Sequence, residues 1–256
     1  MKRQFLKDNY PQLLVYRNEA LQNVGARFVD QLEAPRSRSF FPKVWRAGTR
    51  SSYPGITLGP LKFAAVGPSM IMADEILKGR TKVKVLDVGC AQGRFREYLR
   101  VQDENRELEY VGMDISPPEV PFPVFREIGE VPDSNFDLIF MSEVAEHMPA
   151  DDFAETYLTA FPALLKPTGM AIIGVPNPLT PTVLQRDVTH VQHYPWFDLY
   201  AMLRFFFDEV AVTRTHFIHT PKRLLFYPLR RALSYALEID WCEGLTLVAK
   251  CPRSSF

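Results

Sequence analysis

A regular alternation of apolar runs and amphipathic stretches, from about residue 70 onward, limits this sequence to few folds. Runs such as 83–88 and 136–142 have the length of buried strands, whereas 94–102 and 197–207 carry apolar residues at helical spacing. This alternation predicts an α/β fold with a doubly wound, mostly parallel sheet. Because ligands bind at the carboxyl ends of strands in such sheets, residues that follow the apolar runs are the first site candidates.

The predicted sheet has seven strands. They are expected at 82–89, 108–116, 123–128, 135–143, 167–178, 208–218 and 242–251. Helices are expected at 69–79, 94–102, 150–166 and 197–207, with a kink at Pro162 in the third of them.

The sharpest transition is VKVLDVGCAQGRF at 83–95, where the apolar run ends at Asp87 and Gly89 and Gly93 follow. Glycine is needed where the backbone takes a positive φ or lies against a ligand. The segment differs from the dinucleotide fingerprint G-x-G-x-x-G, because an acidic residue precedes the glycines. A carboxylate there would repel a pyrophosphate but would suit the ammonium end of an amino acid, which disfavours a nicotinamide dehydrogenase.

A second acidic residue follows the next apolar run. YVGMDIS ends in Asp114, about twenty residues beyond the loop. An acid at this place can accept hydrogen bonds from both hydroxyls of a ribose. The loop and Asp114 together indicate a nucleoside cofactor that carries an amino-acid end.

Composition argues against several other classes of protein. Thirty basic and thirty acidic residues give a formal net charge of zero, which disfavours a bulk nucleic-acid binder. The three cysteines show neither metal-ligand spacing nor a disulfide framework. Neither a secretory signal nor an apolar run of membrane-spanning length is present, so a cytoplasmic protein is expected.

Five segments in order resemble the motifs of class I S-adenosylmethionine-dependent methyltransferases. They are VLDVGCAQGRF, YVGMDIS, NFDLIFMSEVAEHM, LLKPTGMAIIGVPNP and DVTHVQHYPWFDLYAML, and they cover roughly residues 70–215. The resemblance implies a Rossmann-like methyltransferase fold and S-adenosylmethionine as co-substrate, and the ubiquinone-biosynthesis O-methyltransferases are a similar group. Ala91 and Thr168 stand where many members have glycine.

The resemblance also implies which residues contact the cofactor. They are Asp87, Gly89, Cys90, Ala91, Gly93, Asp114, Ile115, Glu127, Ile128 and Ser142. The glycine loop with Asp87 would hold the methionine portion, Asp114 the ribose, and Ile115 the adenine. Glu127 and Ile128 would lie at the adenine edge, although Glu130 could take the place of Glu127.

The segment SEVAEHMP, directly after the fourth predicted strand, is the candidate catalytic segment. Glu143, Glu146 and His147 are spaced so that one helical turn would place them on one face. Such acids also occur at ordinary solvated helix starts. His190 and His193 follow the fifth predicted strand, and the resemblance aligns His190 with a histidine of many related enzymes.

These residues allow two mechanisms. Two carboxylates and two imidazoles are a plausible set of ligands for a divalent metal. Alternatively, His147 or His190 removes a proton from the acceptor as a general base, with Glu143 beside it. We favour the metal-free base.

Two regions lie outside the motifs. Residues 1–65 form a predicted helical N-terminal extension, with apolar residues at helical spacing over 11–33 and an irregular segment at 35–60 that could be a lid. The methyltransferase domain is expected over 66–256, with an insertion at about 218–243. Its basic, apolar segment 222–235 could contact a membrane surface, although packing on its own domain is favoured.

The expected function is therefore methyl transfer to oxygen, with a small or lipid-linked hydroxyl acceptor such as a sugar, a glycan or a quinone-type ring. An RNA ribose methyltransferase is an alternative that the neutral charge disfavours. A cofactor-binding module without catalysis is a second alternative.

Overall fold

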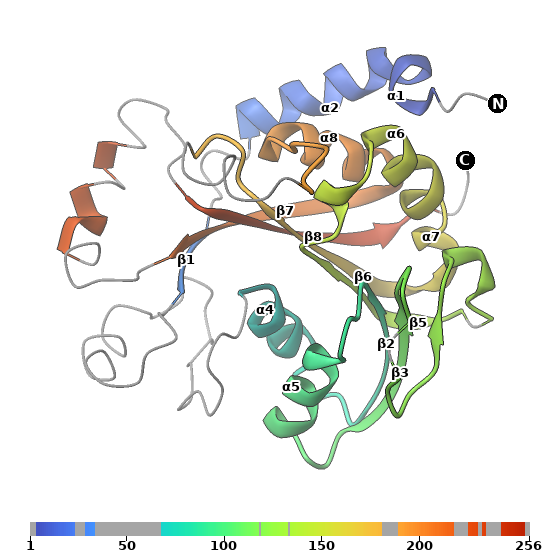
Figure 1. Cartoon of the computed structure of the whole chain (residues 1–256). Coiled ribbons are helices and arrows are strands. Elements are labelled where there is room, and N and C mark those ends of the chain that lie inside the picture. The colour runs from blue at the N-terminus through green and yellow to red at the C-terminus, as the bar shows by residue number, and fades with distance from the viewer. Residues whose placement is uncertain are drawn as a thin grey trace.

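The computed structural model describes residues 4–23, 29–33, 68–117, 119–132, 134–180, 189–217, 225–229, 232–233 and 242–253. Its centre is an eight-stranded sheet with helices on both faces (Figure 1). The strands are β1 Val29–Glu33, β2 Lys82–Val88, β3 Glu107–Met113, β4 Val124–Phe125, β5 Phe136–Ser142, β6 Leu165–Pro176, β7 Phe207–Phe217 and β8 Gly244–Pro252.

The helices fall close to their predicted places. The longer ones are α2 Tyr10–Asn23, α4 Pro68–Leu77, α5 Arg94–Gln102 and α8 Trp196–Phe206. The shorter ones are α1 Phe5–Asp8, α6 Ala150–Asp152 and α7 Phe161–Leu164, the π-helical turn η3 Phe153–Leu158, and the 3₁₀ turns η1 Ile128–Glu130 and η2 Ala145–His147. Pro162 lies in the first turn of α7, where its missing N–H is tolerated, so the helical region is divided at the place where a kink was expected.

The strand order is β1-β7-β8-β6-β5-β2-β3-β4. β8 runs antiparallel to β6 and β7, and the other pairs are parallel. Without β1, the seven remaining strands have the predicted doubly wound arrangement. The carboxyl ends of β2, β3, β5 and β6 therefore lie at one edge of the sheet.

Burial explains why these segments form strands. The last four residues of β2 and the first six of β5 are buried, because helices cover both faces of a parallel sheet. On one face α8 buries Leu199, Leu203 and Phe206. On the other face α4 and α5 bury Leu77 and Leu99 against the sheet (Figure 1).

The N-terminal extension differs from the prediction. The helix expected over 11–33 ends at Asn23, and 29–33 form β1, which pairs in parallel with β7. The prediction of a helix was wrong for this stretch. An edge strand such as β7 presents unpaired N–H and C=O groups, and pairing with β1 satisfies them.

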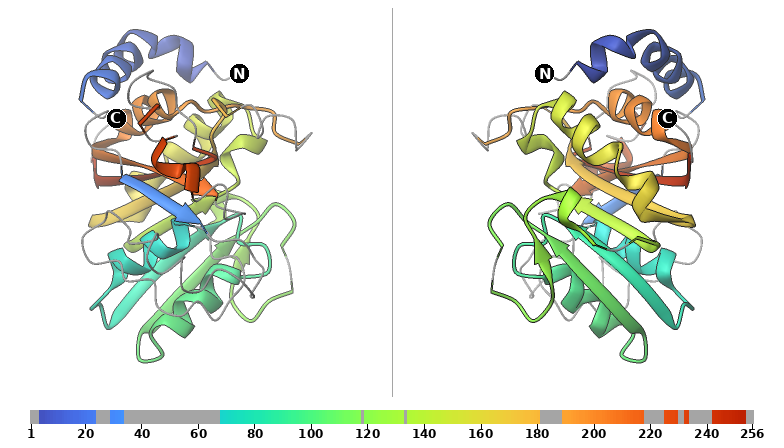
Figure 2. Two further views of the ribbon diagram at one scale, coloured as in Figure 1. Left: turned by 90° about the vertical axis from the view of Figure 1, so that its left-hand side faces the viewer. Right: turned by 90° about the vertical axis from the view of Figure 1, so that its right-hand side faces the viewer.

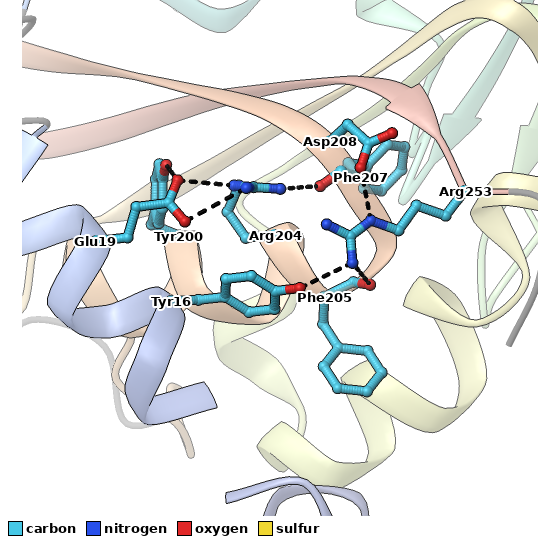
Figure 3. A network of polar contacts seen from close by, with 8 residues as sticks. All are labelled: Tyr16, Glu19, Tyr200, Arg204, Phe205, Phe207, Asp208 and Arg253. Carbon is cyan, nitrogen blue, oxygen red and sulfur yellow. Dashed lines mark hydrogen bonds and ion pairs between the residues drawn. The ribbon is translucent and has the colours of Figure 1, made fainter. Parts of the chain in front are cut away.

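A network of hydrogen bonds and ion pairs connects helix α2 to helix α8 (Figure 3). The Glu19 carboxylate accepts hydrogen bonds from Tyr200 Oη at 2.8 Å and Arg204 Nε at 3.1 Å. Arg253 donates to Tyr16 Oη at 2.8 Å. Figure 2 shows the N-terminal helices stacked beyond α8 on one side of the sheet, so this part of the extension belongs to the folded body.

Some predictions concern residues outside the described ranges. The possible lid at 35–60 lies wholly outside them, and only 225–229, 232–233 and 242–243 of the segment between β7 and β8 lie within them. Among the helices that the structure describes, none combines the length and the apolar character needed to cross a membrane.

Candidate active site

The loop after β2 has the backbone shape that its glycines suggest. Gly89 and Gly93 have φ values of 77° and 73°. A Cβ atom on Gly89 would lie 2.2 Å from Val144 Cγ2, and one on Gly93 would lie 2.6 Å from Phe122 Cε1. Both positions require glycine for conformation and for space. Ala91 also has a positive φ, 43°, which is unfavourable for a residue with a Cβ atom.

Asp87 is buried at the end of β2. Only 4% of the residue is exposed, and its Oδ2 accepts a hydrogen bond from Tyr110 Oη of β3. Burial raises the pKa of the Asp87 carboxyl to about 7, against the opposing effect of the Tyr110 hydrogen bond. Asp87 is therefore part of the packed base of the loop as well as a candidate cofactor ligand.

Asp114 joins the end of β3 to the glycine loop. Its Oδ2 accepts a hydrogen bond from the Ala91 amide at 3.0 Å, and its Oδ1 accepts one from the Ser116 amide at 2.9 Å. The neighbouring Ile115 is 80% exposed, which is unusual for a large apolar side chain. An exposed isoleucine beside an acid at a strand end is suited to pack against the flat face of a ligand.

The remaining predicted cofactor residues have structural partners of their own. The Cys90 thiol is buried, which raises its pKa to about 12. The Cys90 amide donates to the Met113 carbonyl at 3.1 Å, and the Cys90 carbonyl accepts from the Gly93 amide at 2.8 Å. Ile128 packs in the core, and Glu127 and Glu130 form a reciprocal cap on η1. Ser142 Oγ lies 2.9 Å from Ser69 Oγ, at the start of α4.

The turn after β5 is not the regular helical turn that the spacing suggested. Glu143 has a φ of 58°, and a 3₁₀ turn, Ala145–His147, follows it. Non-glycine residues in this region are strained and are concentrated at functional sites. The Glu143 side chain reaches solvent, but protein atoms crowd its carboxyl group, and this burial raises its pKa to about 7 although a hydrogen bond with Glu146 opposes the shift.

The structure brings His147, His190 and Glu146 together, although His190 is far from the other two in the sequence. The two imidazole rings lie edge to face with centroids 4.9 Å apart. His190 Nε2 is 4.0 Å from Glu146 Oε1, and Glu146 is 2% exposed. Thr189 Oγ1 lies 3.0 Å from His147 Nδ1, which leaves Nε2 as the ring atom for other contacts.

The backbone of Glu146 holds in place the loop that contains His190, Val191 and Gln192, called the His190 loop below. Its carbonyl oxygen accepts hydrogen bonds from the amides of Val191 at 2.9 Å and Gln192 at 3.1 Å. Candidate ligand atoms of Glu146, His147 and His190 all lie within 4.8 Å of one another, so the cluster has the size of a metal site as well as that of a proton-transfer site.

Sequence reasoning missed Tyr194. This residue lines a small pocket with Glu146, His190, Gln192 and His193, at the carboxyl end of β6. His193 is exposed and lies outside the cluster of Glu146, His147 and His190. In the sequence, a tyrosine in an aromatic-rich segment cannot be distinguished from an ordinary core residue. Only the fold shows that the Tyr194 hydroxyl is buried beside a carboxylate.

Comparisons with known proteins agree with this architecture. A family model described as "Methyltransferase domain" matches residues 18–215. A SAM-dependent methyltransferase from Archaeoglobus fulgidus has a similar structure, with a TM-score of 0.51 and 20% identity over 71% of this chain and 94% of that one.

A second solved structure has a lower similarity. It is the 1,6-didemethyltoxoflavin-N1-methyltransferase from Burkholderia thailandensis, with a TM-score of 0.45 and 18% identity over 73% of this chain and 79% of that one. A search of curated proteins found no match. Since the family model covers most of the chain and the fold is that of the Archaeoglobus enzyme, this chain belongs to the methyltransferase domain family and is an S-adenosylmethionine-dependent methyltransferase.

Proposed function

We propose that this enzyme methylates oxygen, on a small or lipid-linked molecule that carries a hydroxyl group. The observation that carries the proposal is the cluster of His147 and His190 around the buried Glu146, at the same sheet edge as the glycine loop. A hydroxyl group is a weak nucleophile until a base removes its proton, and a neutral imidazole is the most common base for this task.

The glycine loop and Asp114 fit the cofactor. Gly89 and Gly93 hold the positive φ values of the loop, and the Val144 and Phe122 side chains pack where a Cβ atom would lie. We propose that this backbone, with Asp87, holds the methionine portion, that Asp114 accepts hydrogen bonds from the ribose, and that the exposed Ile115 packs on the adenine. Glu127 and Ile128 are proposed at the adenine edge, and Ser142 as a further member of the same site.

The reaction is a single displacement. The acceptor oxygen attacks the methyl carbon of S-adenosylmethionine, the carbon–sulfur bond breaks, and S-adenosylhomocysteine leaves while the hydroxyl proton passes to an imidazole. Holding oxygen, methyl and sulfur in line is the largest part of catalysis. A positioned base adds about 10²–10⁴-fold.

Two structural features favour His190 as the base. The Glu146 carboxylate lies near His190 Nε2 and stabilises the imidazolium that forms on proton transfer. The hydrogen bonds of Val191 and Gln192 to Glu146 hold the loop so that the ring stays in place. We propose that His147, with Nδ1 engaged by Thr189, lies at the acceptor as a second polar group.

A screen for labelled methyl transfer tests this function. Purified enzyme, methyl-labelled S-adenosylmethionine and a metabolite extract are incubated, and the labelled products are identified by mass spectrometry. The proposal requires a product with a new O-methyl group. N-methylated products would show that the enzyme methylates nitrogen instead of oxygen. Labelled RNA would favour the ribose methyltransferase alternative.

Contact with a membrane surface is a separate proposal for the segment 222–235. Leu225, Phe226 and Leu229 are 77%, 44% and 54% exposed, and the segment is rich in Lys and Arg. Sedimentation with vesicles that contain anionic lipid tests it, with neutral vesicles as the control.

A further inference from the structure

The Tyr110 hydroxyl lies between the end of β2 and the start of α5. It donates a hydrogen bond to Asp87 Oδ2, and the amide of Arg96, in the first turn of α5, interacts with the same hydroxyl. Tyr110 is buried, and this burial raises the pKa of its hydroxyl far above the usual value. The hydroxyl therefore keeps its proton around neutral pH and remains a donor to Asp87.

Aromatic rings fix the Tyr110 side chain against the glycine loop. The Phe122 ring packs edge to face on the Tyr110 ring, with centroids 5.0 Å apart, and the centroid of the Phe95 ring is 6.3 Å from that of Tyr110. Phe122 also fills the space beside Gly93, where an added Cβ atom would lie 2.6 Å from Phe122 Cε1. Tyr110, Phe122 and the glycine loop are therefore packed as one unit.

The Asp87 carboxyl has an oxygen that a ligand can use. Tyr110 engages Oδ2, whereas Oδ1 accepts no hydrogen bond from a described residue and is not among the atoms that are closed off from solvent. Asp87 lies near the carboxyl end of β2, directly before the glycine loop. Oδ1 is therefore the atom open to the amino group of the cofactor.

No cation in the described part of the chain neutralises Asp87. None of the Lys, Arg or His side chains there forms an ion pair with it, and the charged group that acts on its carboxyl is the acidic Asp114. The Arg96 guanidinium of α5 pairs with Glu97 instead, at 2.8 Å. Burial and the Asp114 charge both favour the protonated form of Asp87, so an ammonium group that binds there meets a carboxyl that must release its proton.

Two further titratable groups lie near Asp87, and neither changes charge around neutral pH. The pKa of the Tyr110 hydroxyl is raised far above its usual value, and that of the Cys90 thiol is raised to about 12. Phe140 and Gly112, the residues beside Asp87 on β5 and β3, have no ionisable group. A change in cofactor binding near pH 7 would therefore report on Asp87.

We propose that Tyr110 is a positioning residue for the cofactor: its hydrogen bond fixes the Asp87 carboxyl and favours the charged form to which the cofactor's ammonium group binds. Binding then releases the Asp87 proton to solvent, while the ammonium group keeps its own protons. The inference rests on the placement of the methionine portion at Asp87 under the proposed function. It adds a residue and a pH dependence to that placement.

The test measures binding of S-adenosylhomocysteine by calorimetry between pH 5 and pH 8. The control ligand is 5′-methylthioadenosine, which has the same nucleoside and no amino-acid end. Tyr110→Phe removes the hydroxyl that donates to Asp87. Tyr200→Phe is the matched control variant, because it removes a buried tyrosine hydroxyl that donates to Glu19 at 2.8 Å, away from the glycine loop.

We expect the wild-type affinity for S-adenosylhomocysteine to rise by up to about tenfold per pH unit below the pKa of Asp87 and then to level off. Tyr110→Phe should weaken binding by about fivefold at pH 5, because a hydrogen bond to a charged carboxylate is stronger than one to a neutral carboxyl. The difference should shrink toward pH 8, where Asp87 is increasingly ionised in both free proteins. Tyr200→Phe should follow the wild type, and methylthioadenosine binding should not rise with pH.

A second measurement needs no variant of Tyr110. Calorimetry in two buffers of different ionisation enthalpy counts the protons that leave on binding. The wild type should release about one proton at pH 5 and few at pH 8. Asp87→Asn should release none at either pH, because its amide does not titrate.

The proposal would be overturned if Tyr110→Phe binds like the wild type, or more weakly by one constant factor at every pH, since the latter is a structural effect alone. A wild-type affinity that does not change with pH would overturn it too, as would the same profile for methylthioadenosine or a shifted profile for Tyr200→Phe. None of these measurements uses an acceptor. Failure of the O-methyl transfer screen with proton release intact would thus reject the proposed reaction and keep the role of Tyr110.

Discussion

The Asp114 carboxylate accepts a hydrogen bond of 3.0 Å from the backbone amide of Ala91, and this bond connects the end of β3 to the middle of the glycine loop. Ala91 holds a positive φ of 43° that a residue with a Cβ atom adopts at a cost. Asp114 therefore helps to shape the loop, in addition to the ribose contact proposed for it.

Replacing Asp114 should weaken cofactor binding. Hydrogen bonds to a charged group are worth about 1.5–3 kcal/mol, so Asp114→Ala should lower the affinity for S-adenosylhomocysteine by about tenfold or more. Calorimetry on the variant measures this. Asp103→Ala is the matched control, because Asp103 also accepts a backbone hydrogen bond in a turn, from Asn105 at 3.2 Å. If wild type and Asp114→Ala bind S-adenosylhomocysteine with equal dissociation constants, Asp114 shapes the loop but does not contribute to cofactor binding.

Gly89→Ala should disrupt both the glycine loop and the turn that follows β5. The new Cβ atom would lie 2.2 Å from Val144 Cγ2, in a backbone conformation with φ of 77°. The conformation alone costs about 1–2 kcal/mol for a residue with a Cβ atom, and Val144 must also move. Urea unfolding should show a loss of more than about 1 kcal/mol, and calorimetry should show little binding of S-adenosylhomocysteine. Gly129→Ala is the control, because no atom lies within 4 Å of its added Cβ; similar losses in both variants would contradict this explanation.

Asp87 should make the folded protein less stable as the pH rises. Its folded pKa of about 7 is above the ordinary value, so the folded state holds a proton that the unfolded chain has released. Its contribution is fully present below the unfolded pKa and is lost as the pH rises through about 7. Wild type should therefore lose more stability between pH 5 and pH 8 than Asp87→Asn, as measured by urea unfolding at each pH. Parallel pH dependences in the two proteins would show that Asp87 does not titrate in this way.

The metal-free mechanism makes a direct prediction for the two histidines. His147→Ala and His190→Ala should keep affinity for S-adenosylhomocysteine but lower turnover, by about 10²-fold or more for the base itself. Treatment with a chelator should change the wild-type rate little. Activity that vanishes with a chelator and returns with magnesium or manganese would assign the cluster to a metal instead. Full activity in both variants would mean that neither histidine takes part, and that the enzyme acts only by aligning the acceptor oxygen with the methyl group and the sulfur.

The sequence by itself determined the sheet and the positions of the acids at its edge. Strand and helix patterns are local, because apolar runs and helical spacing are encoded within about ten residues. Once the strands are parallel, their carboxyl ends must lie at one edge, so Asp87, Asp114 and Glu143 could be placed at one edge of the sheet without coordinates. The family match over 18–215 agrees with that order of motifs.

The tertiary structure decided which groups meet within that edge. Residues 29–33 became a strand only because β7 offered an unpaired edge, a long-range effect that overrode the helical spacing. His147 and His190 meet because the His190 loop binds the backbone of Glu146, and Tyr194 lost its solvent partners because the chain packs around its hydroxyl. These contacts join residues distant in sequence, and their energies come from packing and desolvation, which local patterns do not contain.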